Sequence, residues 1–155
     1  MMGSWLLALL IGVVAGLRTM TAPTAVSWAA QLGWLDLRDT WLAFLGYTWT
    51  PWIMSALAIA ELVADQLPST PSRTVPMQFG ARIVSGALSG AAIGAATGSV
   101  GGGLIAGVVG AVVGTLGGHA IRARLAAAFG NDRPAALIED AVAIGGALLI
   151  VIALR

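Results

Sequence analysis

Residues 86–118 read GALSGAAIGAATGSVGGGLIAGVVGAVVGTLGG, and a glycine stands at every fourth position over most of this stretch. Residues four apart lie on one face of an α-helix, so the repeat predicts a helix surface without side chains, along which two backbones pack closely. Interior glycine costs about 0.5–1 kcal/mol relative to alanine in an ordinary helix, whereas close contact between small residues is a main source of helix association in lipid. The stretch therefore predicts a glycine zipper inside a membrane, with a gate or a lipid-binding groove as the alternative use. The glycines of the predicted packing surface are Gly86, Gly90, Gly94, Gly98, Gly110, Gly114 and Gly118.

A single helix over this stretch would be too long for a membrane. Thirty-three helical residues extend for about 50 Å, against a hydrocarbon core of about 30 Å. The triplet Gly101–Gly103 is the natural turn. The sequence therefore predicts a helical hairpin with arms at Gln78–Ser99 and Leu104–Arg124.

Composition predicts an all-α, polytopic membrane bundle that occupies residues 1–155 as one integral membrane domain. The 155 residues are 58% hydrophobic and 10% charged, with a mean hydropathy of +0.90. Without cysteine there are no disulfides or thiolate metal sites, and without lysine there is no Schiff-base chemistry. A net charge of +1 leaves no electrostatic footprint for nucleic acid. The N-terminus lacks the basic segment of a secretory signal, so the first apolar run is expected to stay as a membrane span.

The first span is expected to run from Trp5 to Trp28 and to be kinked or broken near Pro23. Proline removes a backbone donor, and the neighbouring threonine hydroxyls can satisfy the groups that it frees. This places Arg18 near the middle of the membrane. Two alternatives stay open: the helix ends at Leu17 with Arg18 at an interface, or the segment is a re-entrant hairpin that returns to its own side.

About five spans follow from the rest of the pattern. An aromatic connector over residues 31–48 leads to a span that ends at Leu67, before Pro68 and the loop over residues 69–76, and the last span covers Ala135–Leu154. With five spans, more arginines lie on the side of the N-terminus than on the other side. The positive-inside rule then makes the N-terminus cytoplasmic, and the re-entrant alternative would move it outside.

Ionisable side chains from separate spans are predicted to meet in one part of the bundle. Glu61 and Asp65 share a helix face because they are four residues apart. Ionisable groups at membrane depth cost from about 2.5 kcal/mol each, so they face the bundle interior, pair, and often mark an ion or proton path. The structural alternative is a lattice of ion pairs that only locks helices together. The candidate ion- or substrate-binding residues are Arg18, Glu61, Asp65, Arg82, His119, Arg122, Glu139 and Asp140.

Signals for an enzyme are thin. The chain has no His-Glu-x-x-His pair, no Gly-x-Ser-x-Gly elbow and no phosphate-binding loop with lysine. The carboxylates could hold Mg²⁺, but their spacing does not single out a metal site. We therefore expect no catalytic residue and no cofactor, and leave the metal open. A weak repeat places Gly12 and Gly16 on Gly110 and Gly114 at a shift of 98 residues, which would suit an inverted repeat.

The chain resembles a bacterial membrane family known as domain of unknown function 4126. The resemblance is carried by Gly16-Leu17-Arg18, by the stretch from Glu61 to Pro68, by Arg82 with Ser85-Gly86-Ala87-Leu88, and by Pro134 with Leu137-Ile138-Glu139-Asp140. This chain has Ser69-Thr70-Pro71-Ser72 where an acidic loop is expected. The resemblance implies a bacterial inner-membrane protein and supplies no activity.

The sequence thus predicts a small transporter or channel that handles an ion or proton through its carboxylate and arginine cluster. The alternative is a non-catalytic protein that organises structure or lipid. The expected partners are the lipid bilayer, a second copy of the chain in a homo-oligomer, and a small ion or small molecule.

Overall fold

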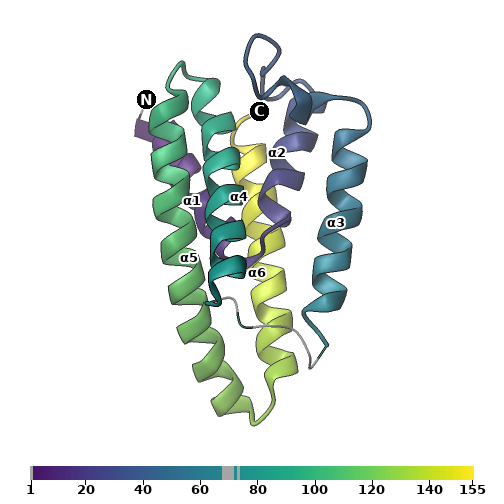
Figure 1. The fold of residues 1–155 in the computed structure, drawn as a ribbon, viewed down its shortest axis with the longest axis vertical. Helices are drawn as coiled ribbons and strands as arrows, with labels where there is room; N and C mark the ends of the chain where they lie inside the picture. Colours follow the sequence, from purple (N-terminus) through teal and green to yellow (C-terminus); the bar gives the residue numbers. More distant parts are fainter. Residues whose placement is uncertain (1, 68–71, 73) are drawn as a thin grey trace.

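The computed structural model of the protein describes residues 2–67, 72 and 74–155, and these residues form helices and no strand. The all-α prediction is confirmed. Pro68 and the loop over residues 69–71 lie outside the described residues. The helices are α1 (Met2–Leu17), α2 (Thr21–Gln31), the 3-10 helix η1 (Ala43–Gly46), α3 (Thr50–Ala64), α4 (Pro76–Ala95), α5 (Val100–Phe129) and α6 (Asp132–Ile152) (Figure 1).

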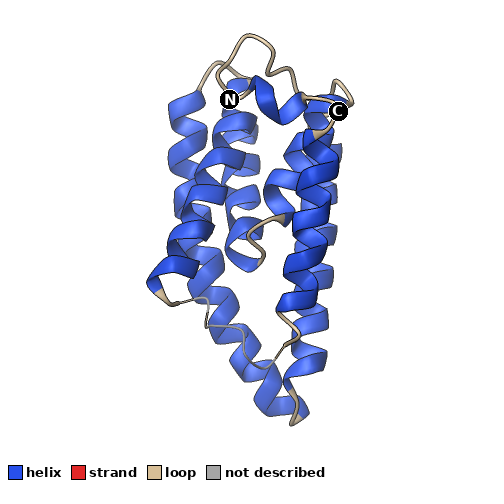
Figure 2. Ribbon diagram, turned by 45° about the vertical axis from the view of Figure 1, so that its right-hand side comes forward, coloured by secondary structure: helices blue, strands red, loops and turns tan. Residues whose placement is uncertain are grey.

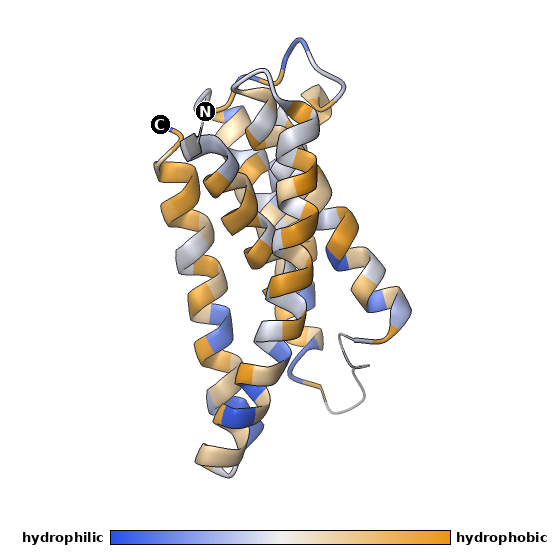
Figure 3. Cartoon of the chain, turned by 90° about the vertical axis from the view of Figure 1, so that its left-hand side faces the viewer, coloured by the Kyte–Doolittle hydropathy of each residue, from blue (hydrophilic) through white to orange (hydrophobic). Residues whose placement is uncertain are grey.

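Two of the described helices, α5 and α6, are long and apolar enough to cross a membrane. Residues 3–17 and α3 are apolar but shorter. The expected count of five spans is therefore not confirmed by helix length. Hydrophobic residues cover most of the helices, and hydrophilic residues concentrate in the half of the bundle away from the termini and in one loop beside them (Figure 3).

The first segment of the chain turns back inside the bundle. Thr97, in the turn between α4 and α5, donates a hydrogen bond to Ser4 near the start of α1, and Arg155 lies 5.7 Å from the ring centre of Trp34, just after α2. The start of α1, the end of α2 and the C-terminus therefore share one end of the molecule (Figure 1). The break between α1 and α2 forms a short loop in the middle of the bundle (Figure 2).

This arrangement corrects the expected continuous span from Trp5 to Trp28. The helix ends at Leu17, as one alternative held, but Arg18 is fully buried and does not lie at an interface. The chain returns to the end of the molecule at which α1 starts, a path that the re-entrant alternative also has (Figure 1). Pro23 is not at the break, because it sits in the first turn of α2, where its missing N–H has no helical partner to lose.

Helices α4 and α5 meet through glycine backbones. A Cβ atom placed on Gly90 would lie 2.8 Å from the Cα of Gly107, and one on Gly94 would lie 2.9 Å from the Cα of Gly103. Gly86 is equally close, since its Cβ would lie 2.6 Å from the Gly107 carbonyl oxygen. These three glycines of α4 are needed because any side chain there would enter the backbone of α5.

Helix α1 shares the same glycine surface of α5, which the sequence did not predict. A Cβ on Gly110 would lie 2.8 Å from the Val13 nitrogen, and one on Gly114 would lie 2.9 Å from the Val13 Cα. From the other side, a Cβ on Gly16 would lie 2.5 Å from the Thr115 nitrogen. The stripe on α5 thus packs against two helices, α4 over its first half and α1 over its second. Gly118 is buried on α5.

The turn of the α4–α5 hairpin differs from the prediction. Gly98, with φ of 73°, lies in the turn and not in a helix contact, whereas Gly101–Gly103 belong to the first turn of α5. The left-handed conformation at Gly98 has little cost only for glycine. The arms are therefore α4 (Pro76–Ala95) and α5 (Val100–Phe129), and not Gln78–Ser99 and Leu104–Arg124.

The suggested internal repeat is not reflected in conformation. Residues 110–127 are one unbroken helix, whereas residues 12–29 contain the break. Gly12 and Gly110, which the repeat would superimpose, instead face each other across the α1–α5 contact, where a Cβ on Gly110 would lie 2.9 Å from the Gly12 Cα.

Helix α3 lies at the edge of the bundle, beside α2 (Figure 1). Pro51 is the one buried residue among its described positions. Trp28 holds it through a hydrogen bond of 3.0 Å to the Ser55 hydroxyl and an edge-on ring contact of 5.0 Å with Trp52. Most of the other residues of α3 are apolar and partly or fully exposed. The C-terminal end of α3 places Glu61, and Asp65 directly after the helix, beside the break.

Candidate functional site

The break between α1 and α2 is filled by polar side chains from other helices. The Glu61 carboxylate of α3 accepts hydrogen bonds from the backbone N–H groups of Thr19, at 2.7 Å, and Met20, at 2.8 Å. These amides stand at the N-terminal end of α2, where the helix dipole favours negative charge. Glu61 therefore acts as a cap supplied from a distant part of the chain.

The carbonyl groups freed at the break have partners from α4 and α5. Arg82 donates from Nη1 to the Gly16 oxygen at 2.7 Å, and the Thr115 hydroxyl lies 3.4 Å from the same oxygen. The Ser85 hydroxyl donates to the Thr19 oxygen. Unsatisfied backbone groups are costly in an apolar interior, so these side chains permit a helix break at this depth.

Arg18 occupies the centre of the cluster. Its side chain is fully buried and forms ion pairs with Asp65, which directly follows α3, and with Asp140 of α6, whose Oδ1 accepts from Nε at 2.5 Å. Both aspartates keep some exposure, 16% and 14% of their side chains. One guanidinium therefore connects three separate parts of the chain.

Among the residues that the structure describes, the charges at the break do not balance. Two cations, Arg18 and Arg82, face three carboxylates, on Glu61, Asp65 and Asp140. Part of the excess negative charge is offset by the positive end of the α2 dipole at Glu61. A further proton or small cation would complete the balance. We call these five side chains the break cluster.

The other predicted residues form a separate group or lie outside it. Arg122 of α5 pairs with Asp132, through Nη2 at 2.6 Å, and with Glu139, through Nη1 at 3.4 Å. Glu139 and Asp140 are neighbours on α6, so the two groups meet there. His119 is exposed on α5, and no contact found among the described residues joins it to either group.

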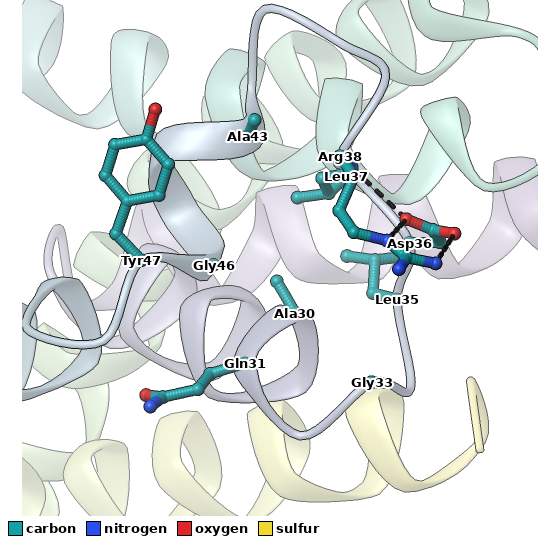
Figure 4. A pocket seen from close by; sticks show the side chains of 10 residues that line it. All are labelled: Ala30, Gln31, Gly33, Leu35, Asp36, Leu37, Arg38, Ala43, Gly46 and Tyr47. Atoms are coloured by element: carbon teal, nitrogen blue, oxygen red, sulfur yellow. Dashed lines mark hydrogen bonds and ion pairs between the residues drawn. The ribbon is translucent and has the colours of Figure 1, made fainter.

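A pocket of about 590 Å³ lies at the opposite end of α2, beside the connector to α3 (Figure 4). Asp36 and Arg38 on its wall pair with each other, with Arg38 Nη2 donating to Asp36 at 2.8 Å. The hydrogen bonds from Arg38 lower the pKa of Asp36 to about 2. These two charges satisfy one another, so the pocket offers no unbalanced charge to a ligand.

Sequence reasoning placed Arg18, Glu61, Asp65, Arg82 and Asp140 together but missed their hydrogen-bonded partners. The backbone amides and carbonyls of the break carry no sequence signal of their own. The sequence does contain a signal for Ser85, whose hydroxyl binds the Thr19 oxygen. Ser85 lies one turn after Arg82 on α4, so the two residues share a helix face.

Among the described residues, no group of three or more His, Asp or Glu side chains is arranged to hold a metal ion. The comparison with curated proteins and that with solved structures each find no match to the chain. The model of one family, described as a domain of unknown function (DUF4126), matches residues 5–153. The chain, over nearly its whole length, therefore belongs to the domain of unknown function 4126 family.

Proposed function

We propose that the protein is an integral membrane transporter or channel that moves a proton or small cation through the break cluster. In this arrangement helices α3–α6 cross the bilayer, and α1 with α2 enters it and returns. Three arginines lie at or beside the α5–α6 turn, Arg122, Arg124 and Arg133, against Arg38 and Arg155 at the other end. The positive-inside rule then makes the α5–α6 turn cytoplasmic and places both termini outside, in place of the cytoplasmic N-terminus expected for five spans.

One observation carries the proposal: a carboxylate, Glu61, binds the N-terminal amides of a helix that begins inside the bundle, next to the buried Arg18. Helices broken near the middle of the membrane are the usual binding elements of secondary transporters, because their ends present uncompensated dipoles to ions. Ionisable groups at such a depth are expensive and usually take part in an ion or proton path. The described part of the chain places one more carboxylate than arginine at the break, and this excess gives the centre an affinity for positive charge.

The proposal assigns roles to individual side chains. Glu61 binds and releases the proton or cation, because the backbone amides that hold it can stabilise its charged form while the site is empty. Arg18 pairs with Asp65 and Asp140 and so fixes the position of α3 and α6. Exposure of the two aspartates gives the centre its contact with the surroundings.

Replacing Glu61 with glutamine tests the proposal. The glutamine oxygen can still accept a hydrogen bond from Thr19 or Met20, so Glu61→Gln should fold with a loss of about 1 kcal/mol in the free energy of unfolding. It cannot take up a proton or balance a cation. We expect proton or cation flux in liposomes, measured with a dye inside the vesicles, to fall at least about tenfold, which is about 1.4 kcal/mol in the transport barrier.

The control is Asp36→Asn, which removes a carboxylate at the other end of α2 and should leave flux unchanged. Wild-type flux in a folded Glu61→Gln protein would contradict the proposal. So would wild-type liposomes with no more flux than liposomes without protein.

A structural role is the second candidate, and the hydrogen bonds at the break favour it. The backbone groups that the break leaves without a helical partner, in Gly16, Thr19 and Met20, all form hydrogen bonds to side chains. A purely structural lattice requires this. Under this alternative the Glu61→Gln change lowers only the stability of the protein. Neither the wild type nor the variant then conducts ions in liposomes.

A further inference from the structure

One face of α4 is polar along most of its length. Gln78, Arg82, Ser85 and Ser89 are spaced by four, three and four residues, so they lie along a single face of the helix. Two of them contact the break, because Arg82 donates to the Gly16 oxygen and Ser85 donates to the Thr19 oxygen. The polar face of α4 is therefore directed at the break cluster.

Ser89 is a buried member of this face whose hydroxyl makes no hydrogen bond to the described residues of the break. It lies one turn beyond Ser85, toward the α4–α5 turn, and is completely buried. Among the residues that the structure describes, its hydroxyl has no hydrogen-bond partner, not even the carbonyl four residues earlier that helical serines often use. A buried hydroxyl without a partner is unfavourable and uncommon in native proteins, and its position calls for an explanation.

We propose that Ser89 lines the route of the proton or small cation between the break cluster and the end of the molecule that holds the termini. The inference rests on the proposed function. Ser89 is completely buried in this conformation, and in the proposed route its hydroxyl gains a water molecule as its partner when the helices around it separate. Gln78 lies on the other side of the break, so the same face of α4 carries polar groups on both sides of the centre, as access from either surface requires.

Thiol labelling tests water access at Ser89 without a transport assay. The chain has no cysteine, so Ser89→Cys introduces one thiol of nearly the same size. The probe is a membrane-impermeant, cationic methanethiosulfonate, applied to intact cells and to inverted vesicles. Gly3→Cys, at the exposed start of α1, shows which preparation presents the end that holds the termini.

In that preparation we expect Ser89→Cys to react at least about tenfold faster than Ala91→Cys. Ala91 is an equally buried residue of α4 that lies off the polar face, so it controls for general opening of the helix. Equal rates for the two thiols would overturn the inference. In liposomes, Ser89→Ala should fold normally and reduce flux about tenfold, whereas a serine that only fills space should be replaceable by alanine without loss.

The outcome is separable from that of the proposed function. If Glu61→Gln abolishes flux while Ser89→Cys stays unreactive, the route through Ser89 is wrong and the proposed function stands. If Ser89→Cys reacts while Glu61→Gln conducts like the wild type, water access at Ser89 is supported and the role of Glu61 is wrong.

Discussion

Replacing Gly107 with alanine is expected to lower the free energy of unfolding by at least about 2 kcal/mol, because this glycine is where three helices meet. A Cβ on Gly107 would lie 2.9 Å from the Gly86 carbonyl carbon and 3.1 Å from the Gly90 Cα. On the other side, a Cβ on Gly12 would lie 2.9 Å from the Gly107 Cα, so α5 has no free space toward α1 into which it could shift away from α4. Overpacking of an interior typically costs 1–3 kcal/mol, and here the obstacles are backbones, which cannot change rotamer. Equilibrium unfolding in detergent measures the effect.

Gly117→Ala is the matched control on the same helix. Nothing lies within 4 Å of a Cβ at Gly117, so the substitution should only add helix propensity and raise stability by up to about 1 kcal/mol. The two alanines are thus expected to act in opposite directions. A neutral or stabilising Gly107→Ala would mean that α1, α4 and α5 do not meet at this residue.

Arg18→Met is expected to lower the free energy of unfolding by about 3–5 kcal/mol. The methionine fills much of the arginine volume, but Asp65 and Asp140 then lose the cation that lies between them in the interior. Removing one member of a buried ion pair leaves the desolvation cost of the other uncompensated. Chemical unfolding of the purified protein, followed by circular dichroism, measures the loss.

Neutralising the carboxylates separates lost charge balance from lost packing. Arg18→Met combined with Asp65→Asn and Asp140→Asn should recover most of the lost stability, because no unpaired charge remains. Arg38→Met, which breaks an exposed pair, should produce no measurable change, since Arg38 is 87% exposed. A single Arg18→Met that unfolds like the wild type would show that Arg18 does not hold the break cluster together.

The helical class and the ionic residues were predictable because they depend on composition and short spacings. The i, i+4 relation of Glu61 and Asp65 placed them on one face, and the requirement that buried charges pair brought Arg18 to them. The spacing could not predict which partner each of the two carboxylates would bind. Glu61 accepts hydrogen bonds from backbone amides, whereas Asp65 pairs with Arg18. The amides that Glu61 binds are available because the helix is broken at this point.

The position of the break was misjudged because local signals pointed to Pro23. A proline in the first turn of a helix disturbs no hydrogen bond, so Pro23 lies within the first turn of α2 and does not interrupt it. The interruption at residues 18–20 is stabilised by Arg82 and Ser85 of α4 and by Glu61 of α3, which are distant in sequence. A break held by tertiary contacts leaves little trace in the local sequence.

The glycine triplet misled for a similar reason. Gly101–Gly103 look like a turn, but Gly103 is needed inside α5 to approach Gly90 and Gly94, and the turn falls at Gly98. Glycine serves both flexible turns and close helix contacts, and sequence alone does not tell the two uses apart. The contact of α5 with α1 was missed because Gly12 and Gly16 are far from the zipper in sequence.

The return of the chain at the α1–α2 break is the feature on which the break cluster and its proposed function depend. It is tested most directly by the side of the membrane on which the two ends of this segment lie. Gly3→Cys and Leu32→Cys, each the single thiol in a cysteine-free chain, mark the start of α1 and the end of α2, and both positions are exposed. A membrane-impermeant maleimide added to intact cells should label both variants, and in inverted vesicles it should label neither. Labelling of one variant from outside and of the other only in inverted vesicles would mean that residues 3–32 cross the membrane, and would contradict the account.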